Sequence, residues 1–138
     1  MNKKQLEQYY GIASNIEAIE QEIYSLYTPV SSPTGRPSTG NTALPSSPTE
    51  QAAMRIIHLK ELVSAEHERM CRLLEEIEEW LTTVEDPEVA SIIRWHYLMR
   101  LNWSKTNMKV YGYPDYDYSR KRVDRYFEKK QRLSELSG

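Results

Sequence analysis

The chain has 138 residues, of which 39% are hydrophobic and 28% are charged, and phenylalanine occurs once. This length has room for one ordinary domain, or for a small domain plus a helical stalk. A single cysteine, Cys71, excludes an internal disulfide and is typical of a reducing compartment. No stretch approaches the roughly 18 apolar residues that a membrane-spanning helix needs. We therefore expect a cytoplasmic protein without a membrane partner.

The net charge of −2 conceals an uneven distribution along the chain. Residues 1–84 hold 7 Lys/Arg against 12 Asp/Glu, whereas residues 94–132 hold 11 Lys/Arg against 4 acids. An acidic half joined to a basic half is typical of a protein whose basic end faces DNA.

Two series of apolar residues with seven-residue spacing predict a helix over residues 1–27. The series are Tyr9, Ile16 and Ile23, interleaved with Ile12, Ile19 and Leu26. Such a stripe is the a/d seam of a coiled coil. Residues 28–49 follow with five of the seven prolines among Ser, Thr and Gly. This composition predicts a flexible linker.

A second heptad helix is predicted over residues 50–84, capped by Ser47 or Thr49. Its two series are Ile56, Val63, Met70, Ile77 and Val84, and Leu59, Leu73 and Trp80. Glu66 interrupts the second series. The two helices can pair as an antiparallel hairpin within one chain or with the helices of another chain, and the pattern leaves both open. We expect a homo-oligomer built through these helices.

Candidate sites for metal and catalysis on this helix are weak. His67 and Cys71 share a helix face, but a tetrahedral zinc site needs two more ligands, so we expect no metal and no cofactor. The acidic run from Glu75 to Glu79 is typical of a solvated face. The sequence has no glycine-rich phosphate loop and no nucleophile set with its base. An enzyme is not expected.

Residues 85–138 carry the start and stop signals of three helices. Asp86 and Pro87 begin the first, which is expected to end near Arg100. Asn102 caps a short second helix from Trp103 to about Tyr111, and Gly112 closes it. Ser119 or Asp117 caps a third helix that runs to about Leu136. The fold class is therefore all-α: paired heptad helices followed by a three-helix, helix-turn-helix domain.

The third helix of this domain is the predicted reader of duplex DNA. Arginine and lysine side chains near its beginning can reach base edges in the major groove, and those two turns later can contact phosphates. The candidate DNA-binding residues are Ser119, Arg120, Lys121, Arg122, Arg125, Lys129 and Lys130, with Lys105 on the middle helix. The expected core of the domain comprises Tyr97, Trp103, Val123, Tyr126 and Phe127, with the last three packing onto Trp103 and Tyr97.

The stretch from Ile92 to Arg132 resembles the sigma-70 region-4-type domain of the phage ArpU/RinA-like regulators of late transcription. The resemblance rests on an aromatic before the first turn (Tyr97), the pair Asn102-Trp103, and the Ser-x-x-x-Val start of the last helix at Ser119. It implies activation of phage late genes in the cytoplasm of a host cell, with RNA polymerase as a candidate second partner.

The chain departs from that family's pattern at three places. Arg100 stands where a glycine is frequent in the first turn, and Thr106 and Asn107 replace an Ile-Ala pair. The turn before the last helix is lengthened by residues 114–117. Two other functions fit the same arrangement of helices: a phage small terminase subunit, which serves DNA packaging, and a coiled-coil adaptor or antirepressor that does not bind DNA.

Overall fold

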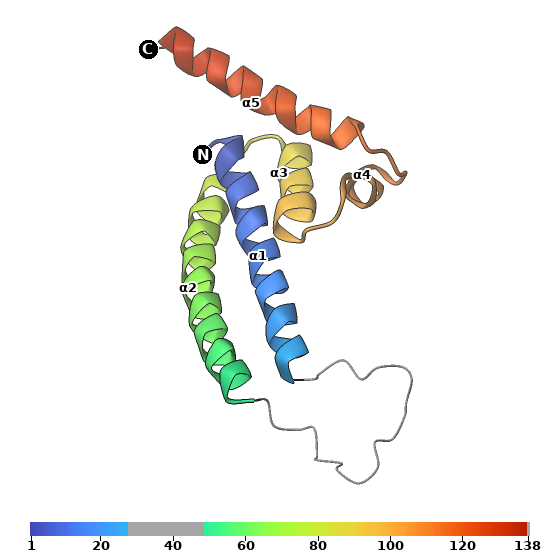
Figure 1. Cartoon of the computed structure of the whole chain (residues 1–138). Coiled ribbons are helices and arrows are strands. Elements are labelled where there is room, and N and C mark those ends of the chain that lie inside the picture. The colour runs from blue at the N-terminus through green and yellow to red at the C-terminus, as the bar shows by residue number, and fades with distance from the viewer. Residues whose placement is uncertain (28–48, 138) are drawn as a thin grey trace. The chain divides into compact units, whose positions relative to one another are not determined.

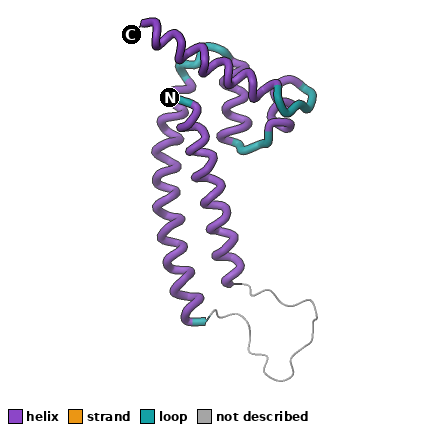
Figure 2. Tube along the Cα trace, turned by 45° about the horizontal axis from the view of Figure 1, so that its top comes forward, coloured by secondary structure: helices purple, strands orange, loops and turns teal. Residues whose placement is uncertain are grey.

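The structure is a computed structural model that describes residues 1–27 and 49–137. Within these ranges the chain forms helices and loops but no strand, which confirms the all-α prediction (Figures 1 and 2). The elements are α1 (Lys3–Tyr27), α2 (Glu50–Leu81), α3 (Pro87–Ile93), a π-helical segment η1 (Arg94–Leu98), α4 (Trp103–Tyr111) and α5 (Tyr118–Ser137). The predicted linker falls outside the described residues except for Thr49.

The chain divides into two compact units. Unit 1 contains residues 1–11 and 70–138, and unit 2 contains residues 12–69. Both α1 and α2 therefore contribute one end to each unit. The predicted domain boundary at residues 84 and 85 does not coincide with this division, because the last turns of α2 and the first turns of α1 group with the C-terminal helices.

Half of the heptad-seam residues are buried within the single chain, and the others, such as Ile23 and Val63, are half-buried. In unit 2, Ile12 and Ile16 of α1 are buried, as are Ile56 and Leu59 of α2, and Arg55 pairs with Glu22 at 3.1 Å. In unit 1 the seam residues Tyr9, Leu73 and Ile77 are buried, together with Leu6 and Leu81, which lie outside the two predicted series. The sequence left open whether these helices pair within or between chains, and the burial shows pairing within the chain.

Side-chain caps at the predicted positions set three of the helix beginnings. The hydroxyl of Thr49 accepts the N–H of Ala52 at 3.1 Å, and the side chain of Asn102 accepts the N–H of Lys105 at 2.8 Å. Asp86 caps α3 with Pro87 in the first turn. These contacts satisfy amide groups that a helix leaves without partners. The caps predicted for α2, α3 and α4 are thus confirmed.

The helix α2 ends at Leu81, three residues before the predicted end at Val84. The hydroxyls of Thr82 and Thr83 donate to the carbonyls of Glu79 and Trp80, both at 2.6 Å. Such local side-chain bonds occupy the last carbonyls and compete with continuation of the helix.

In unit 1, α3, α4 and α5 contact one another around a small apolar core. Val89, Ile92 and Ile93 of α3 are buried, together with Tyr97 of η1 and Val123 of α5. Two of the five expected core residues, Tyr97 and Val123, therefore lie in the core. The other three, Trp103, Tyr126 and Phe127, are only half-buried.

The first helix of this group does not continue as an α-helix to Arg100. It changes at Arg94 into π-helical turns, where the N–H of Met99 donates to the carbonyl of Arg94 at 2.8 Å. Arg100 then adopts a φ of 62°, in the left-handed region that favours glycine. Its guanidinium lies 5.7 Å from the centre of the Tyr10 ring.

The backbone at Arg100 leads to a stability prediction. Replacing Arg100 by either Ala or Gly removes the same contact with Tyr10, but only glycine adopts the left-handed conformation without steric cost. Arg100→Gly should therefore be more stable than Arg100→Ala by about 1 kcal/mol. Urea unfolding of the two variants measures this difference. An alanine variant at least as stable as the glycine variant would contradict the left-handed backbone.

Candidate nucleic-acid interface

One face of α5 is buried and the opposite face is basic. Ser119 and Val123 are buried, and Tyr126 lies beside them on the same side. Each residue turns a helix by about 100°, so the side opposite this face carries Lys121, Arg125, Glu128 and Arg132. All four are exposed. We call Lys121, Arg125 and Arg132 the outward basic face of α5.

The first turn of α5 is held by a buried polar chain rather than by apolar contacts alone. The hydroxyl of Ser119 donates to Oδ1 of Asn107 at 2.6 Å, and Nδ2 of Asn107 donates to the carbonyl of Tyr113 at 2.8 Å. Ser119 and Asn107 are fully buried. The prediction of Ser119 as a DNA contact is therefore corrected: its side chain joins α5 to α4 inside the unit.

The beginning of α5 also differs in detail from the expected cap. The carboxylate of Asp115 accepts the N–H groups of Asp117 and Tyr118 at 2.7 and 3.0 Å, and these bonds lower the pKa of Asp115. The carbonyl of Asp117 accepts the first helical bond, from the N–H of Lys121, at 2.8 Å. The lengthened turn thus supplies its own cap through Asp115.

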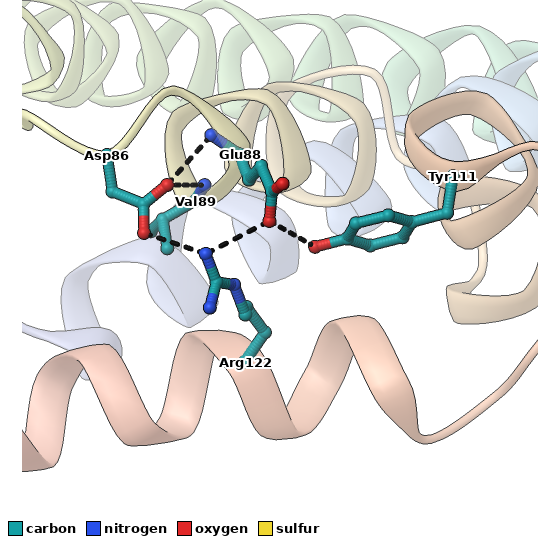
Figure 3. A network of polar contacts seen from close by, with 5 residues as sticks. All are labelled: Asp86, Glu88, Val89, Tyr111 and Arg122. Carbon is teal, nitrogen blue, oxygen red and sulfur yellow. Dashed lines mark hydrogen bonds and ion pairs between the residues drawn. The ribbon is translucent and has the colours of Figure 1, made fainter.

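Arg122 reaches from α5 to the beginning of α3 (Figure 3). Its guanidinium contacts the carboxylates of Asp86 at 2.9 Å and Glu88 at 3.0 Å. The hydroxyl of Tyr111 donates to Glu88 at 3.1 Å. Burial and this bond to a carboxylate raise the pKa of Tyr111 to about 12. The network joins α3, α4 and α5 through four side chains.

The same network constrains the side chain of Arg122, which the sequence predicted as a reader of bases. Burial alone would lower the pKa of Arg122, but the two carboxylates outweigh it and raise that pKa. Because both carboxylates hold the guanidinium against α3, the side chain serves the packing of the unit. Arg122 is therefore a weaker candidate for a DNA contact than the basic residues of α5 that make no such ion pairs.

The remaining candidate residues are exposed, with different degrees of constraint. Arg120 pairs with Asp117 at 2.8 Å, and the ammonium of Lys130 lies 5.7 Å from the ring centre of Tyr126. Lys105 and Lys129 are exposed on α4 and α5. Arg132 was not among the predicted residues. Its spacing of seven from Arg125 and eleven from Lys121 would have placed it on the same face.

Two aromatic clusters replace the single one that the sequence suggested. Trp103 stacks on His96 with ring centres 3.5 Å apart and meets Tyr97 edge-on at 6.0 Å. Tyr126 and Phe127 contact Trp80 instead, at 6.4 and 5.8 Å. The expected packing of Tyr126 and Phe127 onto Trp103 was therefore wrong. The end of α2 supplies their partner, which the heptad pattern had assigned only to the seam.

The first turns of α1 belong to this unit, and the sequence carried no signal of it. Lys3 forms an ion pair with Asp124 in the middle of α5. The ring of Tyr10 stacks on His96 with centres 5.4 Å apart, and Leu6 is fully buried. These contacts join residues more than eighty positions apart in the chain, a separation that no local periodicity can reveal.

His96 is the buried ionisable side chain at the centre of the first aromatic cluster. Its Nδ1 donates to the carbonyl of Leu101 at 2.7 Å. Burial lowers the pKa of His96 from its usual 6.5, although the bond to Leu101 opposes this effect. The neutral imidazole is therefore the form that the fold accommodates.

The described ranges contain no group of three or more potential ligands placed for a metal ion. None of their helices is long and apolar enough to cross a membrane. No known protein family, curated protein or solved structure matches the chain.

The lowered pKa of His96 predicts a loss of stability in acid. Below about pH 6.5 the unfolded chain takes up a proton that the folded chain resists, so the free energy of unfolding should fall as the pH decreases. His96→Gln should flatten this part of the profile, and His67→Gln, at an exposed histidine of α2, is the matched control. Urea unfolding between about pH 5 and 8 tests it. An unchanged slope in His96→Gln would contradict the assignment.

The Arg122 network predicts a second effect on stability. Arg122→Met keeps much of the aliphatic stem but removes both ion pairs, and should lower the free energy of unfolding by about 1–2 kcal/mol, since the pairs are partly exposed. Arg125→Met, on the outward basic face, should change it by less than about 0.5 kcal/mol. Thermal melting followed by circular dichroism compares them. Equal effects of the two substitutions would refute a structural role for Arg122.

Proposed function

We propose that the chain is a sequence-specific, double-stranded DNA-binding regulator of transcription, with α4 and α5 acting as a helix-turn-helix. The observation that carries the proposal is the outward basic face of α5. Lys121, Arg125 and Arg132 are exposed and make no ion pair with any residue that the structure describes, whereas Arg120 and Arg122 pair with acids. These three cations lie opposite the buried face, on the side of the helix that would enter a DNA groove.

The chemistry of these side chains suits the two tasks of a recognition helix. Lys121 and Arg125 lie in the first two turns of α5, where side chains reach base edges, and Arg125 can contact O6 and N7 of a guanine together. Arg132 and Lys129 lie one to two turns later, where the helix leaves the groove, and suit phosphate contacts. This assignment transfers the base-reading role from Arg122 to Arg125.

The biological role within this proposal rests on the resemblance to the ArpU/RinA-like regulators. The left-handed backbone at Arg100 supports it, because the family frequently has glycine at this point. We infer a non-enzymatic activator of phage late genes that binds promoter DNA in the host cytoplasm, with RNA polymerase as its second partner.

The proposal separates two kinds of basic residue by their effect on binding. Arg125→Ala should remove a base contact, cost about 1–3 kcal/mol of binding free energy and relax the preference at one base pair. Arg132→Ala should weaken binding to all sequences alike and reduce the salt slope by about one. The measurement is a salt titration with a site selected from a random duplex pool and with a scrambled duplex.

Arg69→Ala, on α2 in unit 2, is the control and should bind as the unsubstituted chain does. If Arg125→Ala and Arg132→Ala both reduced binding equally on the two duplexes, α5 would bind DNA without reading its sequence. If neither changed binding, the proposed interface would be wrong.

A further inference from the structure

A groove with an apolar floor and a basic rim runs between the beginning of α3 and the second half of α5. Its floor is formed by Val89, Tyr126 and Leu133. Its rim carries four cations, Arg122, Arg125, Lys129 and Lys130, and two carboxylates, Glu85 and Asp86, so positive charge is in excess. Leu133 is 52% exposed although it is a large apolar side chain. Exposed apolar surface bordered by charge is typical of an interaction site.

The apolar floor of this groove faces a different direction from the outward basic face, although the two surfaces share Arg125. Leu133 follows Arg132 directly, so the two side chains diverge by about 100° around α5, and Tyr126 and Leu133, seven residues apart, share one side. A phosphate backbone would gain nothing from leucine and valine, whereas an acidic helix with apolar side chains would use both floor and rim. The groove therefore fits a protein surface that combines apolar and acidic side chains.

The chain itself carries such a surface in unit 2. Met54 and Ile57 of α2 are 66% and 59% exposed, and Glu61 lies four residues after Ile57, on the same face of the helix. Glu61 makes no ion pair with any residue in the described ranges. We call Met54, Ile57 and Glu61 the α2 patch. It matches the groove in kind: apolar side chains against an apolar floor, and a carboxylate against lysines.

We propose that the α2 patch of one copy docks into the α3–α5 groove of a second copy. Charge complementarity supports a second copy as the occupant, because the chain itself supplies both the carboxylate of the patch, Glu61, and the lysines of the groove, Lys129 and Lys130. Each copy has one patch and one groove, so the contact is heterologous and closes into a dimer or ring, or continues as an open chain. It leaves the heptad seam of each chain intact and does not depend on the proposed DNA binding.

Charge reversal tests the contact in the absence of DNA. Lys129→Glu with Lys130→Glu makes the groove acidic, and Glu61→Lys makes the patch basic. In each variant the two surfaces then repel, so self-association should weaken by about tenfold or more. The readout is sedimentation velocity over about a hundredfold range of concentration. The association of the unsubstituted chain should also decrease with salt, because exposed charges are screened.

Mixing the two variants is the decisive arm. The acidic groove of one variant meets the basic patch of the other, and the remaining pair has the natural charges, so the mixture should associate while each variant alone does not. Glu79→Lys, an equal change of charge at another exposed position of α2, should associate as the unsubstituted chain does. A monomer at every concentration, association unaffected by the reversals, or no recovery on mixing would each overturn the proposal.

Discussion

The contact of Arg122 with Asp86 and Glu88 determines how α5 presents the rest of its charge. Arg122 holds α5 against the beginning of α3, and Asp86 caps that helix at the same time. With this side of α5 tied down and Val123 buried beside it, the first two turns of the helix expose their opposite side. The outward direction of Lys121 and Arg125 is thus a consequence of where Arg122 is bound.

The buried hydrogen bond between Ser119 and Asn107 also fixes the orientation of α5, by joining it to α4. It sits in the first turn of α5 and joins it to α4, where two apolar side chains would be expected. A fully buried polar pair is tolerated only when its groups satisfy each other, and it then specifies one register of the two helices. The buried polar side chains of α4 are therefore both satisfied: Ser119 donates to Asn107, and Thr106 donates to the carbonyl of Leu101 at 3.3 Å.

Local signals in the sequence predicted the elements well, and long-range contacts escaped them. Caps at Asp86 and Asn102 and the stop at Gly112 depend on neighbouring residues, so they could be read directly. The seam could be predicted from its period, but its partner could not, because the same stripe suits an intrachain and an interchain pair. The site was harder to predict. A list of basic residues does not separate Arg122, which pairs with two acids, from Arg125, which pairs with no acid in the part of the chain that the structure describes. That difference comes from Asp86 and Glu88, more than thirty residues away.

The membership of residues 1–11 in unit 1 bears on how the chain folds. The unit that carries α5 is assembled from two stretches separated by 58 residues, and Leu6 and Tyr9 are buried in the first of them. Closing so long a loop is entropically costly and slows folding relative to a bundle with local contacts only. During synthesis the first turns of α1 leave the ribosome early, and Lys3 must await Asp124 of α5. A fragment beginning at residue 85 would lack Trp80, on which Tyr126 and Phe127 of α5 pack, and Lys3, which pairs with Asp124.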